Sequence, residues 1–135
     1  MKPEGKIEKP IPTGTERILF IDDEPAIVNI SRQMLDSLGY DVVTRTSSIE
    51  ALELFKAQTD RFDLVITDMT MPQMTGEDLT RELIQIRPDV PVLLCTGFST
   101  RMDEKKALSM GIQAFISKPI LKREIAEAIR AVLDV

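Results

Sequence analysis

The chain has 135 residues and a formal net charge of −5, and hydrophobic residues make up 43% of it. This length fits one domain with a real core. There is no histidine and no tryptophan, with one tyrosine and one cysteine. These counts exclude a histidine-based triad, a histidine-ligated zinc site, a phosphohistidine on this chain and an internal disulfide. They also disfavour an aromatic stacking platform for bases or flavins.

The charge pattern bears on partners and location. The acidic balance and the lack of a Lys/Arg run disfavour direct binding to nucleic acid or to a membrane surface. No apolar run is long enough to span a bilayer, and no signal-peptide core is present. The single cysteine, Cys95, fits a cytoplasmic protein.

The chain begins with a segment of distinct composition. Residues 1–15 contain three prolines and two glycines among alternating charges, which predicts an extended, flexible linker or tail. Residues 16–135 are predicted to form the folded domain.

From residue 16 onward, short apolar runs alternate with segments of helical periodicity. Strands are predicted at residues 18–21, 42–43, 64–68, 91–95 and 114–116. Helices are predicted after the acidic turn at 22–25, after Ser47-Ser48, after Gly76, over 99–110 and from 121 to the end. This alternation predicts an α/β fold: a doubly wound, five-stranded parallel sheet in flavodoxin-like order 2-1-3-4-5, with helices on both faces.

Polar side chains stand where these predicted strands end. The first strand runs into Asp22-Asp23, the third into Asp68, the fourth into Thr96 and the fifth into Lys118. In a parallel sheet these ends share one edge, and ligands bind there where the strand order reverses. Taken singly, each has a plain structural interpretation: a helix cap, a turn residue or a solvated lysine. Their convergence from distant parts of the sequence favours a site.

The expected chemistry follows from the residue types. Three carboxylates in one crevice repel one another, and a single lysine cannot balance them. An oxygen-lined site of this kind suits Mg²⁺, or Mn²⁺ in its place. A carboxylate nucleophile, a divalent cation, an ammonium and a hydroxyl are sufficient for phosphoryl transfer. Met69, Met71 and Met74 are assigned to packing, since no Cys or His joins them as a soft-metal ligand.

Four sequence pieces carry a family resemblance: IDDEP (21–25), ITDMTMPQMTG (66–76), TG (96–97) and SKP (117–119). Together, in this order and each at a strand end, they resemble the receiver domain of bacterial response regulators, from about Arg17 to the end of the chain. The resemblance implies a phosphoacceptor in two-component signalling or a phosphorelay.

Carried over residue by residue, the resemblance makes Asp68 the phosphoacceptor. Asp23, Asp68 and the backbone carbonyl of Thr70 would ligate Mg²⁺ directly, and Asp22 would act through water. The donor would be a phosphohistidine on a histidine kinase or a histidine phosphotransfer domain. Apart from magnesium-dependent self-phosphorylation and self-dephosphorylation, no enzymatic activity is implied.

The resemblance also implies a switch. Thr96 would turn toward the phosphoryl group, Phe115 would swing inward, and Lys118 would pair with Asp68 and then with a phosphoryl oxygen. The face made by the last two helices and the fifth strand would change. The Lys118–Pro119 bond would be cis. By position, Thr70 and Phe98 would tune the lifetime of the phosphate.

Three other functions fit the sequence less well. A phosphorylation-independent docking module would usually lack part of the acidic cluster or the lysine. A flavodoxin-type electron carrier needs a hydroxyl- and glycine-rich loop where this chain has Asp22-Asp23. A haloacid-dehalogenase-type phosphatase needs a second aspartate where this chain has Thr70.

The larger context stays open between two alternatives. The proline-containing lead-in resembles the linker before the C-terminal receiver of a hybrid sensor histidine kinase, in which case the full-length protein would be a histidine kinase. The competitor is a free-standing single-domain regulator. Receiver domains often pair through the face of their last helices, so the resemblance also allows a homodimer.

Overall fold

The computed structural model describes residues 9–97, 109 and 111–134. Its centre is a five-stranded parallel sheet in the order β2-β1-β3-β4-β5. This confirms the predicted α/β class and strand order. The strands are β1 (Arg17–Ile21), β2 (Asp41–Arg45), β3 (Leu64–Asp68), β4 (Val92–Thr96) and β5 (Ala114–Ser117).

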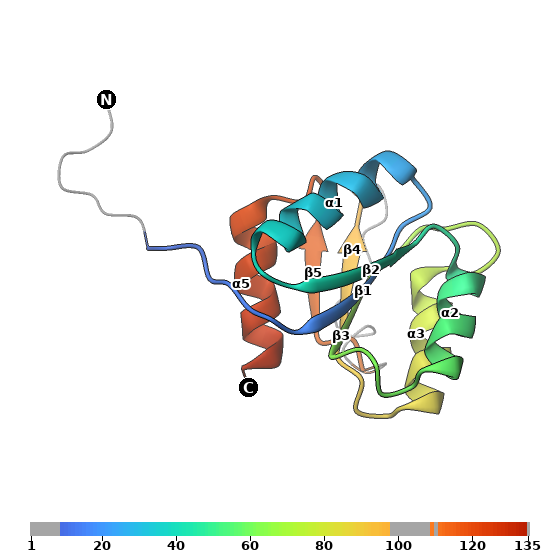
Figure 1. The fold of residues 1–135 in the computed structure, drawn as a ribbon. Helices are drawn as coiled ribbons and strands as arrows, with labels where there is room; N and C mark the ends of the chain where they lie inside the picture. Colours follow the sequence, from blue (N-terminus) through green and yellow to red (C-terminus); the bar gives the residue numbers. More distant parts are fainter. Residues whose placement is uncertain (1–8, 98–108, 110, 135) are drawn as a thin grey trace.

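Helices cover both faces of the sheet (Figure 1). One face carries α1 (Pro25–Ser37) and α5 (Lys122–Leu133), and the other carries α2 (Ser48–Ala57) and α3 (Gly76–Ile86). Of the helix predicted over 99–110, the structure describes residue 109 alone, which is helical, and the rest lies outside the described residues.

The core has two layers because β1 is buried on both faces. Ile18 and Phe20 join the cluster beneath α1 and α5, while Leu19 and Ile21 join the cluster beneath α2 and α3. A strand buried on both faces needs apolar side chains in both directions, which explains its continuous apolar run.

Side-chain hydroxyls cap the starts of α2 and α3, whereas α1 and α5 begin without a side-chain capping hydrogen bond. The Ser47 hydroxyl accepts a hydrogen bond from the Glu50 N–H, and the Thr75 hydroxyl accepts one from the Asp78 N–H. The acidic residue at the start of α1 is Glu24, as the acidic turn predicted, but its side chain makes no capping hydrogen bond. Pro25 occupies the first turn, where its missing N–H has no cost.

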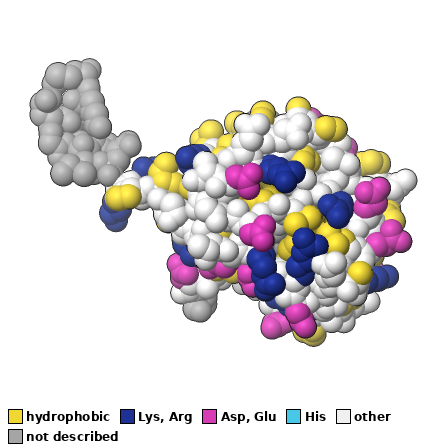
Figure 2. Space-filling model, in the orientation of Figure 1, with side chains coloured by type: hydrophobic (Ala, Val, Ile, Leu, Met, Phe, Trp, Pro, Cys, Tyr) yellow, Lys and Arg dark blue, Asp and Glu magenta, His cyan; other side chains and the backbone are white. Residues whose placement is uncertain are grey.

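The surface mixes charges of both signs. On the face shown in Figure 2, Lys and Arg side chains are interspersed with Asp and Glu. In the described part of the chain, no helix combines the length and the apolar character needed to cross a membrane.

Candidate functional site: an acidic pocket at the carboxyl edge of the sheet

Three carboxylates meet at the ends of β1 and β3. One ligand oxygen each from Asp22, Asp23 and Asp68 lies within 4.8 Å of the others. Asp22 and Asp68 are buried and Asp23 is half-buried. Because β1 and β3 are neighbours in the sheet, Asp22 and Asp23 after β1 lie beside Asp68 at the end of β3, although they are far apart in sequence. This is the arrangement expected at the predicted switch point.

Lys118 supplies the positive charge. Its Nζ donates to Asp22 Oδ2 at 2.8 Å and lies 2.9 Å from Asp68 Oδ1. Although burial disfavours the ammonium, these two contacts raise the pKa of Lys118 above its ordinary value, so it stays charged. The peptide bond from Lys118 to Pro119 is cis.

The pairing of Lys118 with Asp22 was not part of the sequence prediction, which joined Lys118 only to Asp68. Asp22 is also held by the backbone, since its Oδ1 accepts from the Glu24 N–H at 3.0 Å. An aspartate bonded to the N–H two residues on is an Asx turn, and Asp22 ahead of a helix start is the signal for it. Both oxygens of Asp22 therefore have protein partners.

Asp68 sits in an environment that opposes its charge. Burial raises the pKa of its carboxyl, and the neighbouring charges of Asp22 and Asp23 raise it further, against the lowering effect of Lys118. The pocket thus holds more negative charge than one lysine offsets, which favours a bound cation.

The loop after Asp68 folds back tightly against it. The Met69 N–H donates to the Cys95 carbonyl at 2.9 Å, and the Gly76 N–H donates to the Met69 carbonyl at 2.9 Å. A Cβ at Gly76 would lie 2.2 Å from the Asp68 carbonyl oxygen, so only glycine fits where α3 begins. This close approach fixes the backbone of Asp68.

The remaining predicted residues that the structure describes differ in burial and in the element that carries them. Thr96 ends β4, and its carbonyl accepts from the Lys118 N–H at 2.8 Å. Phe115 is half-buried on β5 and packs in a small cluster with Leu94, Ile112 and Met69. Thr70 is exposed in the loop after Met69, and Phe98 lies outside the described residues. Cys95 is buried, and burial raises the pKa of its thiol to about 12, so it stays protonated.

Comparison with known proteins agrees with this geometry. Residues 18–130 match the family described as response regulator receiver domain. The chain is 32% identical over 118 residues to the alkaline phosphatase synthesis transcriptional regulatory protein PhoP of Bacillus subtilis, covering 87% of this chain and 48% of PhoP. It is 29% identical over 132 residues to the sensor kinase CckA of Brucella abortus, covering 97% of this chain and 14% of CckA.

A solved structure matches as well. The receiver domain of the sensor histidine kinase PA1611 from Pseudomonas aeruginosa, with magnesium in its active-site cleft, superimposes with a TM-score of 0.79 at 25% identity, over 90% of this chain and all of that one. The chain therefore belongs to the response regulator receiver domain family, and it is a phosphoacceptor module of two-component signal transduction. It spans about half the length of PhoP and a smaller share of CckA.

Proposed function

We propose that Asp68 is the residue that accepts the phosphoryl group, from a phosphohistidine on a histidine kinase or a histidine phosphotransfer domain. A carboxylate oxygen of Asp68 attacks phosphorus, the bond to the donor imidazole breaks, and the imidazole keeps the electron pair and takes up a proton. The product is an acyl phosphate, which water later hydrolyses. The observation that carries the proposal is a buried carboxylate with an ammonium 2.9 Å away, at the rim of the sheet.

The donor has to come from elsewhere because this chain has no histidine. Lys118 would move part of its hydrogen bonding from Asp68 to a phosphoryl oxygen as negative charge accumulates there. Since Asp22 also binds Lys118, the ammonium stays in the pocket during the exchange.

The residues fit a hard divalent cation, Mg²⁺ or Mn²⁺. Asp22 has both oxygens engaged by Lys118 and the Glu24 N–H, which supports a role through water. Asp23 and Asp68 are left as direct ligands, with the carbonyl of Thr70 as the third. When bound, the cation would neutralise charge on the phosphoryl oxygens.

The switch residues are proposed on position. Thr96, whose carbonyl is tied to the Lys118 N–H, would turn its hydroxyl to the phosphoryl group, and Phe115 would move into the space released. Thr70 and Phe98 would set the lifetime of the acyl phosphate. Replacing Phe98 with alanine is expected to speed dephosphorylation, measured as loss of phosphorylated protein with time, and an unchanged rate would refute the role of Phe98.

The domain boundaries and the kind of protein that contains this domain are also proposals. Residues 16–135 would be the receiver domain and 1–15 the lead-in, either from a hybrid sensor kinase or from a free-standing regulator. The match to CckA, which runs over nearly the whole chain, favours the first. Self-phosphorylation from a small phosphodonor, self-dephosphorylation, a cytoplasmic location and pairing of two copies belong to the same proposal. The docking module that ignores phosphate is less favoured, because the acidic set and the lysine are complete.

The test is intact-protein mass spectrometry after incubation with acetyl phosphate and Mg²⁺. We expect a gain of one phosphoryl mass that is lost with EDTA and lost in Asp68→Asn. The matched control is Asp36→Asn, which changes an exposed aspartate of α1 and should be phosphorylated like the wild type. A gain that persists in Asp68→Asn would contradict the assignment of the acceptor.

Metal binding has an independent readout in stability. A ligand that binds only the folded chain stabilises it by about 2.7 kcal/mol at one hundred times its dissociation constant. Thermal unfolding of the wild type should therefore shift upward with Mg²⁺ concentration. In Asp23→Asn, which removes a proposed direct ligand, the shift should be strongly reduced. An equal shift in the variant would place the cation elsewhere.

A further inference from the structure

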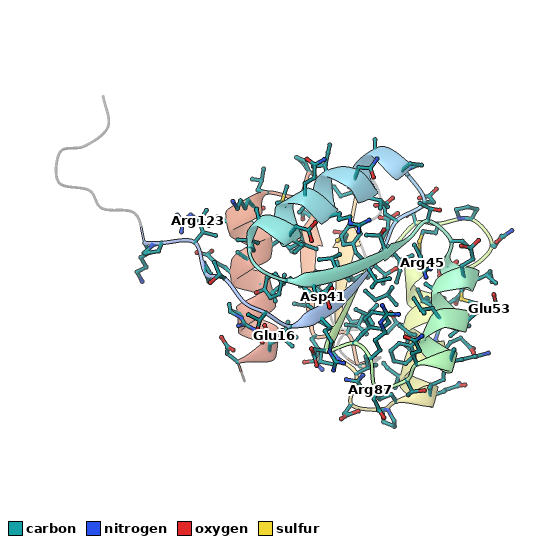
Figure 3. All side chains as sticks on the ribbon, in the orientation of Figure 1. Glu16, Asp41, Arg45, Glu53, Arg87 and Arg123 are labelled. Carbon is teal, nitrogen blue, oxygen red and sulfur yellow. The ribbon has the colours of Figure 1, made fainter. Side chains whose placement is uncertain are left out.

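The segment before β1 lies along α5 and is attached to it at both ends. Near the start of α5, the Arg123 side chain donates to the Lys9 carbonyl at 2.8 Å. Near the end of α5, Arg130 is bonded to the carboxylate of Glu16. Figure 3 shows Arg123 beside this segment and Glu16 further along it, next to α5.

The middle of the segment is seated by apolar and backbone contacts. Ile11 is half-buried and packs against the core cluster beneath α1 and α5. The Gly14 N–H donates to the Leu38 carbonyl, just past α1, at 3.1 Å. The Arg130 guanidinium lies over the Tyr40 ring, 5.9 Å from its centre.

Two glycines allow the segment to pack this closely against the turn after α1. A Cβ at Gly14 would lie 2.5 Å from Cε1 of Tyr40, and one at Gly39 would lie 2.4 Å from the Gly14 carbonyl oxygen. Gly39 also has a φ of +100°, which side chains rarely adopt. The two backbones cross at a distance that larger residues would prevent, so the segment occupies a fitted position.

We propose that residues 9–16 form a strap that ties α5 to the turn after α1, and that phosphorylation of Asp68 loosens the strap through α5. This inference rests on the proposed function of Asp68. The strap would couple the conformation of the acidic pocket to that of the chain that leads into the domain.

The physical link runs through Lys118. Its Nζ holds Asp22 and Asp68, and residues 119–121 join it directly to α5. A phosphoryl group on Asp68 adds oxygens that compete for the Lys118 ammonium. When Lys118 moves toward these oxygens, the start of α5 moves with it. The strap contacts fit the position of α5 in which the Lys118 ammonium contacts Asp22 and Asp68. Because hydrogen bonds weaken steeply with distance and angle, a shift of α5 weakens them.

Coupling of this kind is reciprocal. If the phosphorylated state weakens the strap, then breaking the strap must favour the phosphorylated state by the same factor. Beryllofluoride with Mg²⁺, a mimic of the acyl phosphate, makes this measurable at equilibrium. Hydrogen exchange at the Gly14 amide reports the strap, and ¹⁹F NMR reports beryllofluoride bound at the pocket.

In the wild type we expect beryllofluoride to speed exchange of the Gly14 amide by at least about fivefold, the low end of usual coupling. In Arg130→Gln and in the milder Glu16→Gln, exchange should already be fast without beryllofluoride. Arg130→Gln should bind beryllofluoride more tightly than the wild type by up to the factor found for exchange, and Glu16→Gln by a smaller factor, about twofold. Amide spectra of the sheet residues check that each variant is folded.

The matched control is Arg81→Gln, which removes a surface arginine bonded to Glu77 and Asp78 on α3, away from the strap. It should leave Gly14 exchange and beryllofluoride affinity at the wild-type values. Bound beryllofluoride with unchanged Gly14 exchange would overturn the strap while leaving the proposed function intact. A wild-type chain that binds no beryllofluoride would overturn both.

Discussion

At the carboxyl edge of the sheet, one ammonium, on Lys118, faces three carboxylates that include the buried Asp68. At the opposite edge, where β1 begins, one guanidinium, on Arg130, is bonded to the carboxylate of Glu16. Both groups join parts of the chain that are far apart in sequence. They differ in charge balance and in exposure to water.

The two carboxyl groups respond in opposite ways. Burial and like charges raise the pKa of Asp68. Burial also acts to raise the pKa of Glu16, but its hydrogen bond with Arg130 and further bonds from the backbone outweigh this and lower it. The ionised form is thus disfavoured at Asp68 and favoured at Glu16. A charge that the fold opposes marks a place where a ligand is expected, whereas a balanced pair holds structure.

The largest expected effect distinguishes the backbones at the two edges. Gly76→Ala places a Cβ against the fixed Asp68 carbonyl oxygen, 2.2 Å away. We expect it to lower the free energy of unfolding by about 3 kcal/mol, the upper range for overpacking. Urea unfolding followed by circular dichroism measures the loss.

Gly14→Ala is the comparison at the other edge, since its nearest contact is the Tyr40 ring, a side chain able to turn. It should cost about 1 kcal/mol. Equal costs for the two variants would show that the loop after Asp68 is as free to adjust as the strap.

Next in size is Lys118→Met, which leaves Asp22 and Asp68 buried without a counter-charge. Removing one partner of a fully buried ion pair costs roughly 3–5 kcal/mol. Because the Lys118 side chain keeps 20% of its surface exposed, we expect about 2 kcal/mol at pH 7. The loss should shrink at low pH, where Asp68, whose pKa is raised by burial, becomes protonated. A loss that is independent of pH would indicate that Lys118 stabilises the fold through packing of its side chain and not through its charge.

Asp68→Asn is expected to stabilise the fold. The folded pKa of Asp68 lies above the ordinary value of 3.8, so its ionisation costs stability that grows as the pH rises from 3.8 through the folded pKa. At pH 7 the variant should be more stable by about 1 kcal/mol, the usual size of a single substitution. Unfolding curves of both proteins from pH 3 to about pH 8 test this. Lower stability of the variant at pH 7 would mean that the bond to Lys118 outweighs burial and repulsion.

Glu16→Gln should have the smallest effect and the opposite sign. The folded pKa of Glu16 lies below its ordinary 4.5, so the ionised form stabilises above that pH, and the contribution is lost as the pH falls through the folded pKa. We expect a loss of about 0.5 kcal/mol at pH 7, as for a partly exposed ion pair. The same unfolding series measures the loss. A gain in stability of the variant at pH 7 would mean that the ionised Glu16, like Asp68, destabilises the fold.

Much of the fold and the site follows from the sequence because each strand has an apolar run and a polar stop. The apolar runs at 18–21 and 64–66 predict β1 and β3 directly, and the structure buries both runs. The alternation of strands and helices then restricts the order of the sheet, and that order brings Asp22 and Asp68 together.

What the sequence does not reveal depends on single contacts. Whether Lys118 bonds Asp22 as well as Asp68 depends on the path of the chain after β5, which no periodicity encodes. The prolines and glycines of residues 1–15 indicate an extended segment, and its flexibility stays a prediction. Nothing in that composition predicts that Ile11 packs on the core, because one half-buried side chain creates no pattern.

The span of sequence between Lys118 and Asp22, 96 residues, has a consequence for biosynthesis. A ribosome releases the acidic turn early and the lysine only with the fifth strand, which closes the edge of the sheet. Until then the carboxylates of Asp22 and Asp68 lack their contacts with the Lys118 ammonium. The complete acidic pocket is therefore assembled only after β5 has been made.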